Sequence, residues 1–187
     1  MPIFNGTCTH SLLSTTHRWS LTTLTTPPPD TITSFQSHTR LDLAGGNSAD
    51  ETKVVAWEPH PSSNPDYLNQ VWTIQPIPER QGFDAYTIVN KRSGTYLELV
   101  GGNGTDGFGV TCSKKASGDD QVGATYQEWE FVKIKEGYYK VRNVASQNYL
   151  DIDSGSSDNG TKIQGWWGQL DGNENQLWAF EKAGDNA

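Results

Sequence analysis

Three short sequence patterns recur three times in the same order, and this repetition constrains the fold more than any other feature of the chain. The first opens each unit, at Ile32–Ser34, Ile88–Asn90 and Val141–Asn143. The second places an acid between apolar residues, at Leu41–Leu43, Leu97–Leu99 and Leu150–Ile152. The third is Gln-x-Trp, at Gln70–Trp72, Gln127–Trp129 and Gln176–Trp178. The acidic positions 42, 98 and 151 are separated by 56 and 53 residues, so three copies of one supersecondary unit are predicted.

Each unit alternates apolar and polar residues with the period of a β-strand. Residues 129–135 and 139–142 are examples, and turns rich in Gly and Asn follow at 45–47, 101–103 and 158–160. No segment sustains the period of a helix. One unit alone would expose an apolar face and unpaired strand edges, so the three copies are expected to close around a pseudo-threefold axis. The predicted class is all-β.

The length of 187 residues fits one domain with an extension. Residues 1–28 are rich in Ser, Thr and Pro, and we interpret them as an N-terminal extension. Residues 29–187 form the predicted domain, with repeats at about 30–80, 81–135 and 136–182. The net charge of −8 has the wrong sign for general nucleic-acid binding or for an anionic membrane surface.

The N-terminal residues and the cysteines predict a cytoplasmic protein. Residues 11–14 hold only two leucines where a signal peptide needs an apolar segment, and no stretch reaches the ~18–20 apolar residues of a membrane span. Cys8 and Cys112 allow at most one disulfide, and we favour two free thiols in a reducing compartment, although pairing stays open. Release by a non-classical route also stays open.

The three Gln-x-Trp blocks, in register with the three acidic blocks, resemble the ricin-B-type β-trefoil lectins, in particular the single-domain mushroom lectins. The resemblance covers about residues 30–182 and implies twelve strands, six in a short barrel and six in a hairpin cap. It also implies sugar binding, agglutination and a role in fungal defence. The family's usual within-repeat cysteines are missing, which matches its cytoplasmic mushroom branch. We assign Trp72, Trp129 and Trp178 to the core, and expect the motif glutamines to bond backbone groups.

A neutral sugar needs an acceptor for its hydroxyls, a flat apolar surface for its C–H groups, and amides that fix its orientation. The third repeat has this set in Asp151, Gln164, Trp166 and Asn175. In the family the matching positions bind galactose-type sugars, so the resemblance implies a galactose or N-acetylgalactosamine site. Trp167 is adjacent, and since neighbours in a strand point to opposite faces, one indole is expected inward; we assign Trp166 to the ligand.

The first repeat has a second candidate site at Asp42, Trp57 and Asn69. Val55 stands where the third repeat has Gln164, which removes a hydrogen bond of about 1 kcal/mol, so weaker or altered binding is expected.

The second repeat has Glu98, Ser113 and Tyr126 at the acid, platform and amide positions, and is expected to be inactive. Either Asp42 or Asp151 alone could be a turn carboxylate that bonds local backbone N–H groups. A tryptophan at matched spacing favours a binding surface instead.

No pattern predicts a metal, a cofactor or catalysis. The four histidines are scattered, without metal-ligand spacing or a triad order, so a non-enzymatic protein is expected. The predicted partners are glycans of glycoproteins or glycolipids, with agglutination through several weak sites, and a homodimer stays open. The alternative is a β-trefoil protease inhibitor that acts through a loop at 59–67 or 116–124, because one fold hosts both activities. A third alternative is a carbohydrate-binding module of a larger enzyme.

Overall fold

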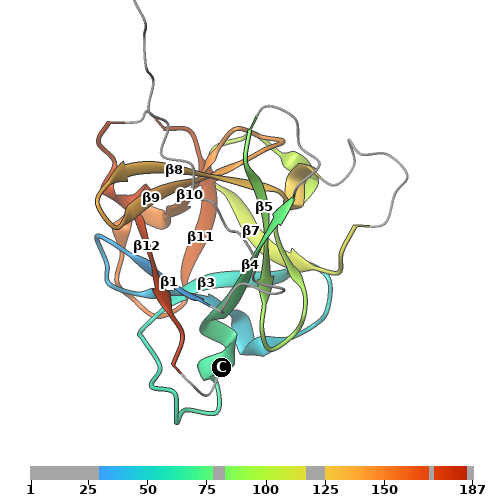
Figure 1. Ribbon diagram of the computed structural model, residues 1–187, viewed down its shortest axis with the longest axis vertical. Coiled ribbons are helices and arrows are strands. Elements are labelled where there is room, and N and C mark those ends of the chain that lie inside the picture. Colours follow the sequence, from blue (N-terminus) through green and yellow to red (C-terminus); the bar gives the residue numbers. More distant parts are fainter. Residues whose placement is uncertain (1–29, 78–82, 117–124, 169–170, 185–187) are drawn as a thin grey trace, which may run out of the picture.

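Each repeat of the sequence folds into four strands in the same order (Figure 1). The computed structural model describes residues 30–77, 83–116, 125–168 and 171–184, so the extension predicted at residues 1–28 lies outside the described residues. The first repeat comprises β1 (Asp30–Ser34), β2 (Arg40–Leu43), η1 (Ala44–Gly46), β3 (Thr52–Trp57), η2 (Tyr67–Gln70) and β4 (Val71–Ile77), where η is a 3-10 helix. The second comprises β5 (Ala85–Asn90), β6 (Tyr96–Leu99), η3 (Val100–Gly102), β7 (Phe108–Ser113), η4 (Thr125–Gln127) and β8 (Trp129–Lys135). The third comprises β9 (Tyr138–Asn143), β10 (Tyr149–Ile152), η5 (Asp153–Gly155), β11 (Thr161–Trp166), η6 (Glu174–Gln176) and β12 (Trp178–Lys182).

Six of the strands close into a barrel. Antiparallel pairing runs from β1 to β4, β5, β8, β9 and β12, and β12 pairs with β1 again. This closure leaves no strand edge of the barrel unpaired. The predicted all-β trefoil is therefore confirmed in its barrel.

The other six strands form three hairpins that cap one end of the barrel. Each hairpin pairs the second and third strands of a repeat, β2 with β3, β6 with β7, and β10 with β11. The third strands β3, β7 and β11 also pair with one another, so the hairpins meet around the threefold axis. The acidic block lies on the second strand of each hairpin, which brings the acids to equivalent places in the cap.

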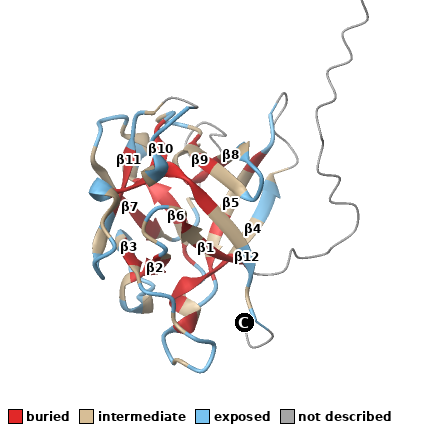
Figure 2. Cartoon of the chain, turned by 90° about the vertical axis from the view of Figure 1, so that its left-hand side faces the viewer, coloured by how far each residue is buried: buried red, intermediate tan, exposed pale blue. Residues whose placement is uncertain are grey.

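The three motif tryptophans occupy the core, as predicted. Trp72, Trp129 and Trp178 are fully buried, and Figure 2 shows the buried strand segments that surround this centre. Each indole Nε1 donates to a backbone carbonyl of the acidic block, those of Leu41, Leu97 and Leu150, at 3.0, 3.0 and 2.9 Å. A buried indole N–H needs such a partner, and this one ties the barrel to the cap hairpin of the same repeat.

The motif glutamines bond backbone groups, as predicted, but two of them also reach the repeat's acid. The side-chain amide of Gln70 donates to the carbonyl of Glu58 at 2.9 Å and to Asp42 at 3.0 Å. Gln127 donates to the carbonyl of Lys114 at 3.0 Å and to Glu98 at 2.8 Å. The Gln-x-Trp block therefore helps to place the candidate binding acid.

Cys112 is a free, fully buried thiol in the core, as predicted, and Cys8 lies outside the described residues. Burial raises the pKa of the Cys112 thiol, which keeps it protonated and unreactive at neutral pH. None of the described helices has the length and apolarity to cross a membrane. In the same part of the chain, no group of three or more His, Cys, Asp or Glu side chains could hold a metal ion.

Candidate functional site

The three acids occupy equivalent, buried positions in the cap. Asp42, Glu98 and Asp151 are 4%, 4% and 2% exposed. Each lies on the second strand of its hairpin, and its partners across the hairpin are Val55, Thr111 and Gln164, respectively. Because each acid occupies the same place in its hairpin, differences between the sites arise from the side chains and loops around it.

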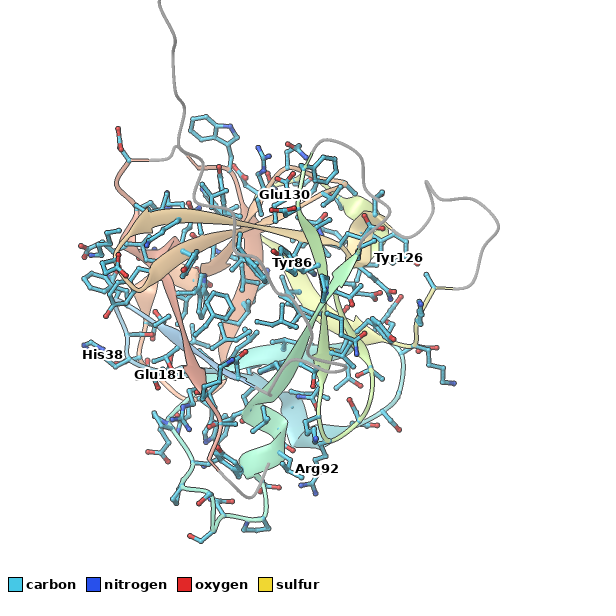
Figure 3. The ribbon with its side chains drawn as sticks, in the orientation of Figure 1. His38, Tyr86, Arg92, Tyr126, Glu130 and Glu181 are labelled. Carbon is cyan, nitrogen blue, oxygen red and sulfur yellow. The ribbon has the colours of Figure 1, made fainter. Side chains whose placement is uncertain are left out.

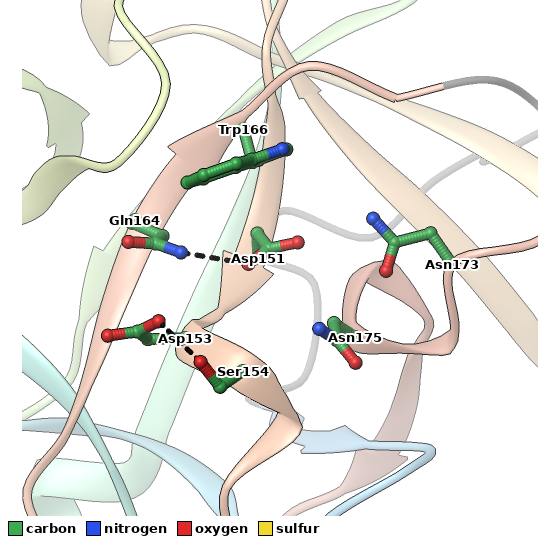
Figure 4. Close-up of a pocket in the computed structure, with 7 residues that line it drawn as sticks. All are labelled: Asp151, Asp153, Ser154, Gln164, Trp166, Asn173 and Asn175. Atoms are coloured by element: carbon green, nitrogen blue, oxygen red, sulfur yellow. Dashed lines mark hydrogen bonds between the residues drawn. The ribbon is translucent and has the colours of Figure 1, made fainter.

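In the third repeat these side chains form a shallow surface pocket of about 200 Å³ (Figure 4). The four predicted residues, Asp151, Gln164, Trp166 and Asn175, all line it. The structure thus gathers on one surface an acid, two amides and an indole that are as much as 24 positions apart in the chain (151 to 175). Their role in binding stays a prediction.

The Asp151 carboxylate has one oxygen that is hydrogen-bonded and one that is buried without a partner among the described residues. Its Oδ1 accepts a hydrogen bond from the Gln164 amide at 3.2 Å. Its Oδ2 is buried and has no hydrogen-bond partner among the described residues. Burial raises the pKa of Asp151 above its ordinary value, while the nearby amides of Gln164, Gln176 and Asn173 oppose that rise. A buried acceptor without a donor lowers stability. A ligand hydroxyl that donates to Oδ2 would remove this cost, which favours binding.

The indole of Trp166 forms the apolar wall of the pocket. It ends β11, is 41% exposed, and lies above Gln164 and Asp151 in Figure 4. The expectation that one indole of the adjacent pair points inward is wrong, because Trp167 is 61% exposed. The strand ends at Trp166, and strand alternation therefore does not extend to Trp167.

Sequence reasoning missed three pocket residues, Asp153, Ser154 and Asn173. Asp153 and Ser154 begin η5, directly after the acidic block, and the Ser154 hydroxyl donates to Asp153 Oδ1 at 3.1 Å. The corresponding helices of the other repeats begin with Ala44 and Val100. That local difference between otherwise matching repeats was the signal available in the sequence.

The asparagine before the motif glutamine, Asn175 or Asn69, lies against a glycine of the cap that leaves space for its side chain. A Cβ on Gly155 would lie 2.7 Å from Asn175 Oδ1, and one on Gly46 would lie 2.4 Å from Asn69 Oδ1. Asn69 is buried, and its Oδ1 has no partner among the described residues. In both repeats the close approach requires glycine, which fixes the amide beside the cap.

In the first repeat the acid is buried as it is in the third, but its neighbours differ. Asp42 Oδ2 accepts from Gln70 and lies 4.0 Å from Nε2 of His60, a residue that the sequence analysis did not select. Burial raises the pKa of Asp42 to about 6, partly offset by the Gln70 hydrogen bond and the His60 charge, with Asp66 raising it further. Trp57 is half-buried. The three predicted residues are present, but part of the acid's bonding capacity is already used.

In the second repeat the acid is satisfied within the protein. Glu98 Oε1 accepts from Ser113 at 2.6 Å and from Thr111 at 3.3 Å, and Oε2 accepts from Gln127. Ser113 supplies no apolar surface, and Tyr126, labelled in Figure 3, stands in place of the asparagine. This geometry supports the expectation that the second repeat has no sugar site.

The family model described as ricin-type β-trefoil lectin domain-like matches residues 15–113 and 125–187. The chain belongs to this family. Its resemblance to mushroom lectins is likewise supported by structure, as follows. No curated protein sequence matches the lectin significantly.

Several solved structures share the fold of this lectin domain. The designed threefold symmetric protein ThreeFoil is 24% identical with a TM-score of 0.67, over 83% of this chain and 99% of that one. The Macrolepiota procera ricin B-like lectin, solved in complex with lactose, is 22% identical with a TM-score of 0.63, over 87% and 100%. An exo-β-1,3-galactanase from Clostridium thermocellum is 23% identical with a TM-score of 0.70, over 86% of this chain and 31% of the enzyme. The same fold thus makes up a whole chain in some of these structures and part of a larger enzyme in another.

Proposed function

We propose that this lectin domain binds galactose-type sugars, galactose or N-acetylgalactosamine, through the pocket of its third repeat. The observation that carries the proposal is the buried Oδ2 of Asp151, which has no hydrogen-bond partner among the described residues and lies in a pocket beside the exposed indole of Trp166. A charged acceptor next to an apolar plane matches the two faces of a hexose, which has hydroxyls at its edge and C–H groups on its ring.

In the proposed complex, two neighbouring hydroxyls donate to Asp151, and the apolar ring face packs on Trp166. The axial 4-hydroxyl of galactose leaves the hydrogens on C3, C4 and C5 together on one face, which suits a flat indole. Gln164 already bonds Asp151 and holds the carboxylate in place, while Asn175 can orient the sugar. No charge on the ligand is needed.

The pocket favours neutral sugars over anionic ones. Asp153 adds a second, exposed carboxylate to the Asp151 pocket, in a protein of net charge −8. A sialylated or sulfated sugar would bring its negative charge close to both carboxylates, and the repulsion would be weakened by salt.

We propose a second, weaker site at Asp42, Trp57 and Asn69. Each site alone is expected to bind in the range of ~mM to tens of µM, because a few hydrogen bonds and one stacked face must also offset ordering costs. Two sites on one domain would engage a glycan-covered surface together and agglutinate cells, since linkage raises affinity by ~10²–10⁴. Glycans of glycoproteins or glycolipids are the proposed partners.

The protease-inhibitor alternative is less well supported. Within the loop at 59–67, the carbonyl of His60 accepts from Arg40 at 3.1 Å and its N–H donates to Gln70 at 2.9 Å, which ties one end of the loop to the cap. The other candidate loop lies mostly outside the described residues. A lectin acting without catalysis remains the proposal.

The proposed site is tested by replacing each indole of the adjacent pair. Trp166→Ala should weaken lactose binding at least tenfold in a calorimetric titration and remove most of the signal on a glycan array. Trp167→Ala is the matched control. Trp167 directly follows Trp166 and is more exposed, but it is not among the residues that line the pocket. Equal binding by the wild type and Trp166→Ala, with both variants folded, would overturn the assignment.

A further inference from the structure

A turn in each repeat is hydrogen-bonded to the cap hairpin of the next repeat. Asp106 Oδ1, in the loop between η3 and β7, accepts from the backbone N–H of Trp167 at 2.6 Å. The corresponding contacts join Asn159 Oδ1 to the N–H of Glu58 at 2.7 Å, and Asp50 Oδ1 to the N–H of Lys114 at 2.8 Å. In every case the donor directly follows the platform position, which is Trp57, Ser113 or Trp166. The hydrogen bond therefore holds the end of the strand that carries the platform residue.

The residue after Asp106 is Gly107, which lies next to the platform residue Trp166. Gly107 has a φ of 82°, and its N–H donates to the carbonyl of Gly165 at 2.9 Å. A Cβ on Gly107 would lie 3.5 Å from Cζ3 of Trp166 and 3.7 Å from Oε1 of Gln164. The Cβ position of Gly107 in the second repeat therefore lies at ordinary van der Waals distance from the indole edge and from an amide of the third-repeat pocket.

The three repeats provide an internal comparison. Gly160 has a φ of 87° and would place a Cβ 3.9 Å from Cζ3 of Trp57, so the second tryptophan platform is also backed by a glycine. Where the platform is Ser113, the backing residue is Glu51, with a φ of 61°. Its N–H donates at 2.9 Å to the Ser113 hydroxyl, which in turn donates to Glu98. A glycine therefore lies next to each of the two tryptophan platforms, whereas a glutamate lies next to the serine that replaces the third.

We propose that Asp106 and Gly107 of the second repeat are positioning residues for the third-repeat sugar site. Asp106 holds the end of β11, and Gly107 sets the plane of the Trp166 indole. The inference rests on the proposed sugar binding by Trp166. It gives the second repeat, which is expected to lack a sugar site of its own, a part in building the site of its neighbour.

The first test compares two glycines with the same backbone strain. Gly137 has a φ of 78° in the β8–β9 hairpin, and a Cβ there would meet nothing within 4 Å. Gly107→Leu and Gly137→Leu should therefore lower thermal stability by similar amounts, because both force an L-residue into left-handed backbone. A methyl at position 107 would make only ordinary contact with the indole, whereas the longer leucine side chain would compete with the indole for space. Only Gly107→Leu should therefore weaken lactose binding, by about tenfold, with Gly137→Leu within twofold of wild type. Equal lactose affinities for the two variants would overturn the proposal.

The second test reads the indole without a sugar. The indole ¹H–¹⁵N resonance of Trp166, assigned by its loss in Trp166→Phe, should shift in Gly107→Leu and Asp106→Ala. It should stay in place in Gly137→Leu and in Asp106→Asn, because an asparagine makes the same contact at position 159. An unmoved resonance in Gly107→Leu would overturn the positioning role. Failure of the wild type to bind lactose would refute the proposed function alone. The Trp166 resonance is measured without sugar and reports the position of the indole whether or not lactose binds.

Discussion

The second and third repeats both carry a buried acid at the same place in the cap hairpin, yet the two acids differ in their hydrogen bonds. Glu98 meets hydrogen-bond donors on both oxygens, from Thr111, Ser113 and Gln127. Asp151 has one oxygen bonded, and its other oxygen is buried without a partner among the described residues. The longer side chain of Glu98 and the hydroxyl of Ser113 supply internal bonds that the third repeat lacks. We therefore expect the binding potential of a repeat to depend on which bonds its acid has left, rather than on the presence of the acid.

The shared frame of the two repeats is tested by removing its core tryptophans. Trp129→Ala and Trp178→Ala should each lower the free energy of unfolding by about 3–5 kcal/mol, because each removes a fully buried ring and its N–H bond to the acidic block. Chemical denaturation with matched m-values measures this loss. A much smaller loss in one repeat would show that the two frames are not equivalent.

A stronger test of the comparison is to restore the second site. In a Trp57→Ala and Trp166→Ala background, in which both proposed sites have lost their indole, Glu98→Asp, Ser113→Trp and Tyr126→Asn together should create lactose binding that the background lacks, at ~mM affinity. Adding Glu51→Gly should strengthen it, because the new indole would gain the backing that Trp166 has. Calorimetric titration of the folded variants measures both steps. Continued absence of binding after all four changes would mean that more than these side chains separates the repeats.

The smallest expected effect is the pH response of the first repeat. The pKa of Asp42 is raised to about 6, so acidification from pH 7 to 5 should protonate it and weaken lactose binding in the Trp166→Ala background severalfold. Stability should move the other way. The folded state holds this proton more tightly than the unfolded state, so the contribution to stability is full below the ordinary pKa and is lost as pH rises through about 6.

Asp42→Asn is the matched control for this pH response. Relative to it, the wild type should gain about 1 kcal/mol between pH 7 and pH 5, measured by denaturation at each pH. Identical pH profiles for the two proteins would contradict a raised pKa at Asp42.

The sequence alone was sufficient for the fold because its pattern repeats. The three Gln-x-Trp blocks predict the buried indoles, and three acids in register predict equivalent cap positions, both of which depend only on local strand alternation. Four residues of the candidate pocket follow from the repeat pattern, whereas Asp153 does not, because it stands where the other repeats have Ala44 and Val100 and shows only as a departure from that pattern. The exposure of Trp167 was missed because the strand ends one residue earlier. The contact between His60 and Asp42 depends on how a loop folds back, which spacing does not encode.

The central claim is that the third repeat binds a galactose-type sugar through the unpaired oxygen of Asp151. A crystal structure of the protein soaked with lactose tests it most directly. The account predicts the galactose ring flat on Trp166, with two hydroxyls within hydrogen-bond distance of Asp151 and no sugar at Glu98. Lactose bound elsewhere on the domain, or an Asp151 pocket left without sugar at saturating lactose, would contradict it.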